Sequence, residues 1–185
     1  KTFTHSQMDG YLWMKKALDD RGVTFKFYHC SNSAGIIDVK EANLDLVRAG
    51  ISTYGLYPSS EVKKENVPLK PAMELISHVA HVKWVKEGTP VSYGGTFITK
   101  RPTKIATIPV GYGDGYPRLL SNRMEVLLRG RRCPVVGRIC MDMCMVDVTD
   151  VPDAVPGDVA ELYGREGLLE QAAALAGTIP YELLC

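Results

Sequence analysis

The sequence predicts an α/β region followed by a mostly β region, and three observations support that order. Up to about Pro58, apolar residues at helical spacing alternate with short β-branched and aromatic runs, a pattern typical of parallel α/β structure. Pro58, the two serines after it and the charged run Glu61–Glu65 then form a linker. Beyond the linker, apolar and polar residues alternate, which indicates half-buried antiparallel strands. We expect a first domain over residues 1–67 and a second over residues 68–185.

The first region predicts a helix, a strand, a second helix and a second strand. The helix runs from Ser6 to Gly22, because Ser-Gln-Met-Asp resembles a capping box and apolar residues follow at helical spacing. Residues 23–28 are aromatic and β-branched, which predicts a buried strand. A helix over about 39–47 and a strand near 51–56 complete the unit. Such short connections favour parallel α/β structure.

The second region predicts several strands and one helix. Alternation begins at Met73 and continues to Trp84. Glycine and proline then separate strands around 91–98, 104–111, 124–129 and 133–148. Leu168–Ala176 is predicted to be a helix that ends at Gly177.

Composition excludes several classes of protein. The 185 residues carry a net charge of +1 with the basic side chains scattered, so neither nucleic acid nor an anionic membrane is an expected partner. No apolar run is long enough to span a bilayer, and the first residues do not resemble a signal peptide. The 5 cysteines have no disulfide-framework spacing, which favours a reducing cytoplasm. Cys140 and Cys144 lack the partners of a zinc site, so no metal is expected.

Four motifs carry the most specific information about function. They are His29–Gly35, Val47–Pro58, Val91–Phe97 and Gly137–Asp142. In sequence and in order they resemble bacterial alanine racemases, and the resemblance extends from Thr4 to Cys185. It implies the C-terminal portion of a (β/α)8 TIM barrel, followed by an antiparallel β-strand domain. It also implies a cytoplasmic isomerase of fold type III that interconverts L- and D-alanine for peptidoglycan synthesis, with pyridoxal 5'-phosphate as its cofactor.

The resemblance also assigns cofactor-binding residues. Loops after late barrel strands commonly bind phosphate through small residues, backbone N–H groups and helix N-termini. Arg48 is expected to face the pyridine nitrogen, where most enzymes of this cofactor use a carboxylate. Because an arginine does not give up its proton, the ring becomes a weaker electron sink. The complete set that the resemblance implies is Ser33, Arg48, Gly50, Ile51 and Tyr181.

Tyr93 is the expected catalytic residue of this chain. Racemisation requires a base on one face of the substrate and an acid on the other, and the resemblance gives one face to this tyrosine. An unperturbed phenol has a pKa near 10, so the role requires cationic or hydrogen-bonding neighbours. His5 matches the family histidine that links the tyrosine to Arg48, although the stretch after it is shorter than the family pattern. We expect His5 in a strand.

The remaining assignments concern the substrate and a partner subunit. The resemblance implies a head-to-tail homodimer, in which Tyr93 and the backbone N–H of Met141 complete the site of the other subunit. Asp142 supports Met141, and Tyr181 is bulky enough to favour alanine over serine. The loop Gly111–Gly115 has neither the glycine order of a nucleotide loop nor the acidic spacing of a calcium loop. The resemblance instead implies a substrate entry corridor lined by Tyr112, Arg118, Arg138 and Ile179.

One element of the family pattern is missing. The resemblance implies a lysine that binds the cofactor covalently in an N-terminal motif, and none of the lysines here lies in such a motif. We therefore expect this lysine in a preceding part of the protein. Two alternatives remain open: a racemase that also accepts serine, and a non-catalytic C-terminal fragment that serves dimerisation.

Overall fold

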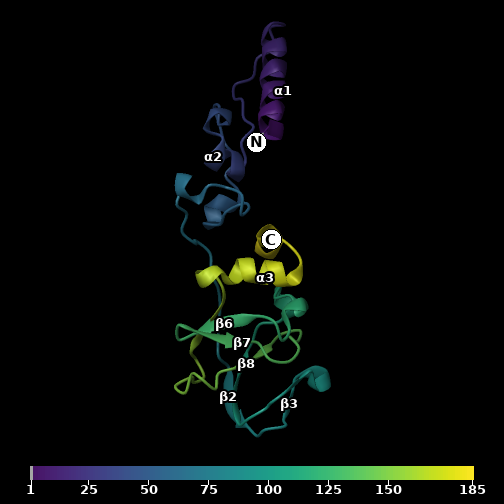
Figure 1. Cartoon of the computed structure of the whole chain (residues 1–185), viewed down its shortest axis with the longest axis vertical. Helices are drawn as coiled ribbons and strands as arrows, with labels where there is room; N and C mark the ends of the chain where they lie inside the picture. The colour runs from purple at the N-terminus through teal and green to yellow at the C-terminus, as the bar shows by residue number, and fades with distance from the viewer. Residues whose placement is uncertain (1) are drawn as a thin grey trace. The chain divides into compact units, whose positions relative to one another are not determined.

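The computed structural model describes residues 2–185 and divides the chain into two compact units, Lys1–Lys70 and Pro71–Cys185 (Figure 1). The first unit contains helices and 3-10 turns. The second unit contains the β-strands and two further helices. Each unit has its own contacts and is described separately.

The first unit opens with a long helix. Its elements are α1 (Thr2–Asp19), α2 (Ser33–Asp38), η1 (Lys40–Ala42), η2 (Ile51–Tyr54) and η3 (Lys64–Asn66). The prediction of a helix before Gly22 is confirmed, but the capping box at Ser6 is wrong because α1 is already helical from Thr2. Residues 2–5 include no glycine or proline that would prevent the helix from extending to them. Lys15 and Asp19, one helical turn apart, form an ion pair at 2.7 Å.

The two strands expected in the first unit are absent. Residues 23–28 belong to no strand, and residues 51–54 form the 3-10 turn η2. The expected helix over 39–47 is reduced to η1. A strand requires hydrogen bonds to a neighbouring segment along its length. In the first unit, the described chain pairs only a few residues in this way. The amide of Asp45 donates to Tyr28 O at 3.1 Å and that of Arg48 to Ser31 O at 3.0 Å, so these two segments run side by side in the same direction.

The end of this unit is organised around one tyrosine. The hydroxyl of Tyr57 accepts a hydrogen bond from the amide of Leu69 at 3.0 Å and donates to Val67 O at 3.2 Å. The predicted linker is therefore folded back on itself rather than extended. The chain enters the second unit at Pro71.

The second unit is built from antiparallel strands. One sheet has the order β1-β9-β6-β7, another β2-β5-β8, and β3 and β4 form a two-stranded hairpin. A single bridge, Val135 to Val146, joins the chain after β7 to β8. The strands are β1 (Leu75–His78), β2 (His81–Val85), β3 (Pro90–Val91), β4 (Phe97–Ile98), β5 (Thr103–Ile108), β6 (Glu125–Leu128), β7 (Arg131–Pro134), β8 (Cys144–Asp147) and β9 (Val159–Tyr163).

Several predictions for this unit are confirmed and others are wrong. The helix α3 (Leu168–Ala176) has the predicted bounds, and Gly177 ends it with φ 73°. The run 91–98 is a hairpin around the 3-10 turn η4 (Tyr93–Gly95), not one strand. The run 133–148 is two strands, because residues 136–143 belong to no strand. Strand β9 and the helix α4 (Pro180–Leu184) were not predicted.

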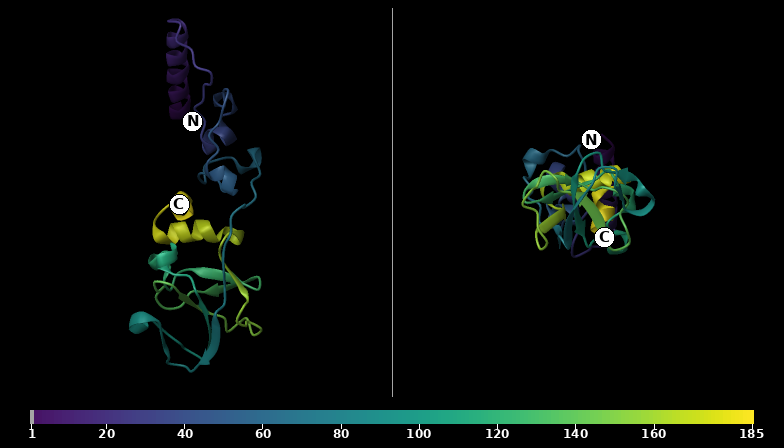
Figure 2. Two further views of the ribbon diagram at one scale, coloured as in Figure 1. Left: turned by 180° about the vertical axis from the view of Figure 1, so that it is seen from behind. Right: turned by 90° about the horizontal axis from the view of Figure 1, so that it is seen from below.

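The core of the second unit lies between its sheets and α3. Figure 2 shows α3 lying along one side of the β-strands. It packs onto β9 and onto the 3-10 turn η6 (Arg118–Leu120). Side chains from all these elements are fully or almost fully buried, which removes a large apolar area from water. They include Ala106, Ile108, Leu120, Val126, Leu128, Val146, Leu162, Leu168 and Ala172. Within residues 2–185, the structure contains no helix of the length and apolar character that a bilayer span requires.

Candidate functional site

In the first unit, hydroxyl and amide groups gather around Ser33. Its Oγ accepts hydrogen bonds from the amides of Gly50 at 3.2 Å and Ser52 at 3.3 Å, and lies 3.1 Å from the hydroxyl of Ser52. Ser33 begins α2, and Asn32 caps that helix by accepting from the amide of Gly35. Two amides at the start of η2 therefore point at the hydroxyl of Ser33, the residue with which α2 begins. This is the chemistry of an anion-binding position, and a phosphate ester fits the donors present.

Arg48 lies beside this cluster and is held by a histidine. Its Nη1 is 2.7 Å from Nδ1 of His29, and its Nη2 donates to Cys30 O at 3.4 Å. The backbone bond from Arg48 to Ser31 keeps the two segments in register. The guanidinium is exposed and has a fixed direction, as a group that faces a ring nitrogen requires. No role was predicted for His29 from the sequence, although this residue begins the motif His29–Gly35.

His5 lies on α1 and not on a strand, so the expected strand is wrong. Its Nδ1 is 4.0 Å from a carboxylate oxygen of Glu41, and both side chains are exposed. The described contacts of Arg48 involve His29 and not His5. In this structure the histidine that pairs with Arg48 is therefore the one on the neighbouring segment of the unit.

In the second unit, most of the remaining predicted residues lie on the segment 137–143 and on two further segments that contact it. The amide of Tyr112 donates to Cys140 O at 3.0 Å, and the amide of Gly113 donates to Met141 O at 2.7 Å. A Cβ on Gly111 would lie only 2.3 Å from Cys140 O, so the backbones touch where this glycine stands. The segment 137–143 is therefore the central platform of the site.

The turn that carries Tyr93 lies on the same platform. Ser92 Oγ donates to Arg138 O at 2.6 Å, and the Asn122 side chain links Thr96 Oγ1 at 3.1 Å to the amide of Gly137 at 2.6 Å. A Cβ on Gly137 would lie 2.7 Å from Val91 O, so only glycine permits this crossing. One end of the turn is thus hydrogen-bonded to this segment directly and the other end through Asn122.

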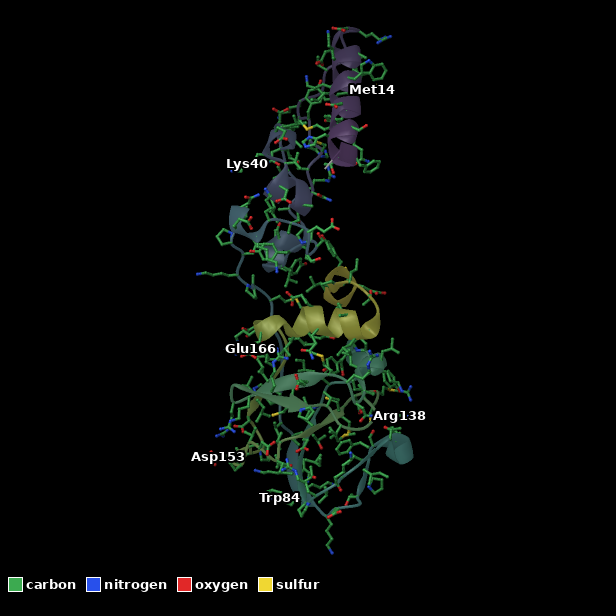
Figure 3. The ribbon with its side chains drawn as sticks, viewed as in Figure 1. Met14, Lys40, Trp84, Arg138, Asp153 and Glu166 are labelled. Atoms are coloured by element: carbon green, nitrogen blue, oxygen red, sulfur yellow. The ribbon has the colours of Figure 1, made fainter. Side chains whose placement is uncertain are left out.

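The side chains predicted for substrate and entry are open to solvent. Tyr93 is 72% exposed and Met141 is 63% exposed. The guanidinium of Arg138 lies against Gly94, next to Tyr93, and Figure 3 shows it beside the η4 turn. Tyr112, Arg118 and Asp142 are also exposed. The second unit therefore brings together the predicted residues Tyr93, Tyr112, Arg118, Arg138, Met141 and Asp142.

Two predicted residues lie elsewhere in this unit. Ile179 precedes α4 and Tyr181 lies in its first turn. In Figures 1 and 2, α4 and the β3–β4 hairpin stand at opposite ends of the second unit. Partial burial raises the pKa of Tyr181 above its ordinary value, so this hydroxyl stays neutral. Within one copy of the unit, Tyr181 and Tyr93 therefore do not belong to the same group of residues.

Tyrosine and cysteine side chains behind the site are buried and uncharged. The rings of Tyr116 and Tyr163 are 5.6 Å apart, and loss of hydration raises the pKa of both phenols well above their usual value. Burial also raises the pKa of the Cys144 thiol to about 12. Among residues 2–185, no three histidine, cysteine or acidic side chains converge as metal ligands would.

Comparison with known families covers both units. The family model described as "Alanine racemase, N-terminal domain" matches residues 1–58. The model described as "Alanine racemase, C-terminal domain" matches residues 72–185. Together with these matches, the fold corresponds to the C-terminal part of a barrel domain followed by an antiparallel β domain. The chain belongs to the alanine racemase family.

Individual relatives are similar over the whole chain. An alanine racemase of Clostridium perfringens (strain SM101 / Type A) is 49% identical over 100% of this chain and 49% of its own length. One from Methanococcus maripaludis is 48% identical over 100% of this chain and 50% of its own. The structure of the Clostridium difficile 630 alanine racemase in complex with cycloserine has a TM-score of 0.95 and 44% identity, covering 100% of this chain and 49% of that one. The chain therefore spans about half the length of the relatives it matches.

Proposed function

We propose that the protein to which this chain belongs is a pyridoxal phosphate-dependent alanine racemase that interconverts L- and D-alanine for peptidoglycan synthesis. The observation that carries the proposal is the combination, within residues 29–52, of donors grouped around Ser33 and a guanidinium directed by His29. Membership of the alanine racemase family supports the same activity. Because the chain spans about half of its relatives, activity, cofactor, substrate and cytoplasmic location are proposed for the whole protein.

The first unit is proposed to hold the cofactor. Ser33, Gly50 and Ile51 would donate to its phosphate, in line with the donors gathered at the starts of α2 and η2. Arg48 would donate to the ring nitrogen while His29 accepts from the guanidinium. Because arginine keeps its proton, the ring nitrogen would remain unprotonated. When bound, pyridoxal phosphate supplies an electron-withdrawing ring that makes the Cα proton of an amino acid acidic.

The second unit is proposed to supply one of two proton-transfer groups. Tyr93 would take or return the Cα proton at its Oη, and a lysine outside these residues would serve the opposite face. The Met141 amide would donate to the substrate carboxylate, with Asp142 beside it. His5 would link the tyrosine to Arg48, although the described neighbour of His5 within one copy is Glu41.

The entry and the partner subunit belong to the same proposal. Two arginines, Arg118 and Arg138, would attract the substrate carboxylate toward Tyr112 of the same copy and Ile179 of the other copy, an effect that salt weakens. The separation of α4 from the β3–β4 hairpin supports a homodimer, in which Tyr181 and the cofactor of one copy meet Tyr93 of the other. We propose domains at 1–67 and 68–185.

The cofactor assignment is tested by replacing the matched segment of the Clostridium perfringens enzyme with residues 1–185. Ser33→Ala in this hybrid should weaken pyridoxal phosphate binding at least tenfold, measured by the absorbance of the bound cofactor. Ser31→Ala is the matched control, since its hydroxyl donates to Ala42 O at 2.8 Å and lies outside the cluster. Equal cofactor affinity in the two variants would argue against Ser33.

The activity is tested in the same hybrid with both alanine enantiomers and with serine. Racemisation of alanine, with serine turned over much more slowly, is the expected result. A folded, cofactor-loaded hybrid that racemises neither amino acid would favour a non-catalytic role for this chain.

A further inference from the structure

Ser92, directly before Tyr93, has an unusual backbone conformation. Its dihedral angles are φ 63° and ψ −177°, a combination that is populated almost only by glycine. A serine remains there only if surrounding contacts favour this conformation over a relaxed one. Neither composition nor motif spacing explains why a residue with a side chain stands at this position.

Hydrogen bonds of the Ser92 side chain supply such contacts. The hydroxyl donates to Arg138 O at 2.6 Å and lies 3.6 Å from the sulfur of Cys140. The backbone of Val91 and Ser92 crosses directly over Gly137, where a Cβ would lie 2.7 Å from the Cβ of Ser92. Thus the serine is in close contact with the platform segment 137–143 that carries Met141.

The far end of the same turn is held by a different side chain. Asn122 links Thr96 to the amide of Gly137. Between these two ends, Tyr93 is largely exposed, and no hydrogen bond to its hydroxyl is present among the described contacts. The direction of its phenol is therefore set by the backbone of the turn, because its own polar group has no protein partner there.

We propose that Ser92 is a positioning residue, which fixes the phenol of Tyr93 relative to the Gly137–Met141 segment through its hydroxyl bond to Arg138 O. This inference rests on the proposed racemase function for its kinetic consequence. Its structural part, the orientation of the tyrosine, stands on the geometry alone. Loss of the hydroxyl should let the turn relax and move the phenol away from the position at which it exchanges a proton.

Two substitutions separate the hydroxyl from the backbone strain. Ser92→Ala removes the hydrogen bond and keeps a Cβ in the strained region. Ser92→Gly also removes the hydrogen bond, but its backbone adopts a positive φ without strain and the fold is preserved. Thr103→Val is the matched control, because the Thr103 hydroxyl donates to a backbone carbonyl, that of Arg101, at 2.7 Å, and none of its described contacts joins it to the η4 turn.

The kinetic measurement uses the complete protein with its cofactor. Both Ser92 variants should lower kcat at least tenfold with less than a threefold change in KM. They should raise the α-deuterium isotope effect for the one alanine enantiomer whose Cα proton faces Tyr93. A general loss of folded protein would lower the active fraction but leave the isotope effects unchanged. Unchanged isotope effects are also the result expected for the control, Thr103→Val. Unchanged isotope effects in Ser92→Gly would overturn the proposal.

A second measurement does not depend on activity. Fluorotyrosine at position 93 should give one 19F resonance in the parent protein and a shifted or averaged resonance in Ser92→Gly. An identical resonance in both would contradict the positioning role. If the parent protein lacks racemase activity while the resonance shifts, the proposed function fails and the positioning of Tyr93 by Ser92 stands.

Discussion

The two units of this chain differ in whether their extended segments pair with other strands. In the second unit, strands far apart in sequence pair with one another, and Leu128, Val126 and Leu162 become fully buried between them. In the first unit, residues 23–28 pair with no strand, and Phe25 and Phe27 are more than half exposed. In this chain, therefore, extended apolar runs form strands where another segment is available to pair with them.

The largest expected effect comes from the same substitution made in each unit. Leu128→Ala should lower the free energy of unfolding by about 3 kcal/mol, because it leaves a cavity in a fully packed core. Leu12→Ala, on the partly exposed α1, should cost less than about 1 kcal/mol. Urea unfolding followed by circular dichroism measures both. Equal costs would break the contrast between the units.

The next effect concerns the platform of the site. Gly137→Ala should lower the free energy of unfolding by about 2–3 kcal/mol, because the new Cβ meets Val91 O and Ser92 at a positive φ. Gly130 has nearly the same φ, but open space surrounds it, so Gly130→Ala should cost about 1 kcal/mol. Thermal unfolding of the two variants separates steric contact from backbone strain. A cost for Gly137→Ala no greater than that of the control would refute the close crossing.

A smaller effect is expected where β7 meets the start of α3. Arg132 contacts Glu125, Glu166 and Gln171, and Figure 3 labels Glu166 at that helix start. Arg132→Ala should cost about 1 kcal/mol, since the network is partly exposed. Arg123→Ala, for which the described contacts include no ion pair, should cost less than about 0.5 kcal/mol. The difference should shrink in 1 M salt, and a difference unaffected by salt would exclude an ionic origin.

The smallest effect is a pH dependence confined to the second unit. Burial raises the pKa of the Cys133 thiol to about 11, from a usual value of 9.0. Because the folded protein holds this proton more tightly than the unfolded chain, its contribution to stability is complete below about pH 9 and is lost as the pH rises through about 11. Cys133→Ala should flatten the fall in stability over this range. An unchanged pH profile would assign the fall to other groups.

Much of the second unit could be predicted because its signals are local. Apolar spacing and Gly177 determine α3, and alternation from Met73 onward predicts the first antiparallel strands. Strand β9 was missed because Glu161 lies in its middle, and a charged residue there suggests an exposed loop. In the structure Glu161 is buried, since Arg165 pairs with its carboxylate at 2.8 Å.

The sequence predicted which residues belong to the candidate site, but not which of them contact one another. Short motifs identify Arg48 and Tyr93, but the pairing of Arg48 with His29 joins residues 19 positions apart. The bond from Ser92 to Arg138 joins residues 46 positions apart. No local pattern carries such information, because folding decides which segments become neighbours. The strand expected around His5 was wrong for a local reason, since His5 lies within the continuous helix α1.

The most direct test of the central claim is alanine racemisation by the complete protein with Tyr93→Phe. The variant keeps the ring and removes only the group proposed to exchange the proton. We predict at least a hundredfold loss of kcat with unchanged cofactor binding, because general acid–base groups contribute about 10²–10⁴-fold to rate. Normal racemisation in both directions by the phenylalanine variant would contradict the assignment of Tyr93 and the two-base mechanism proposed for this chain.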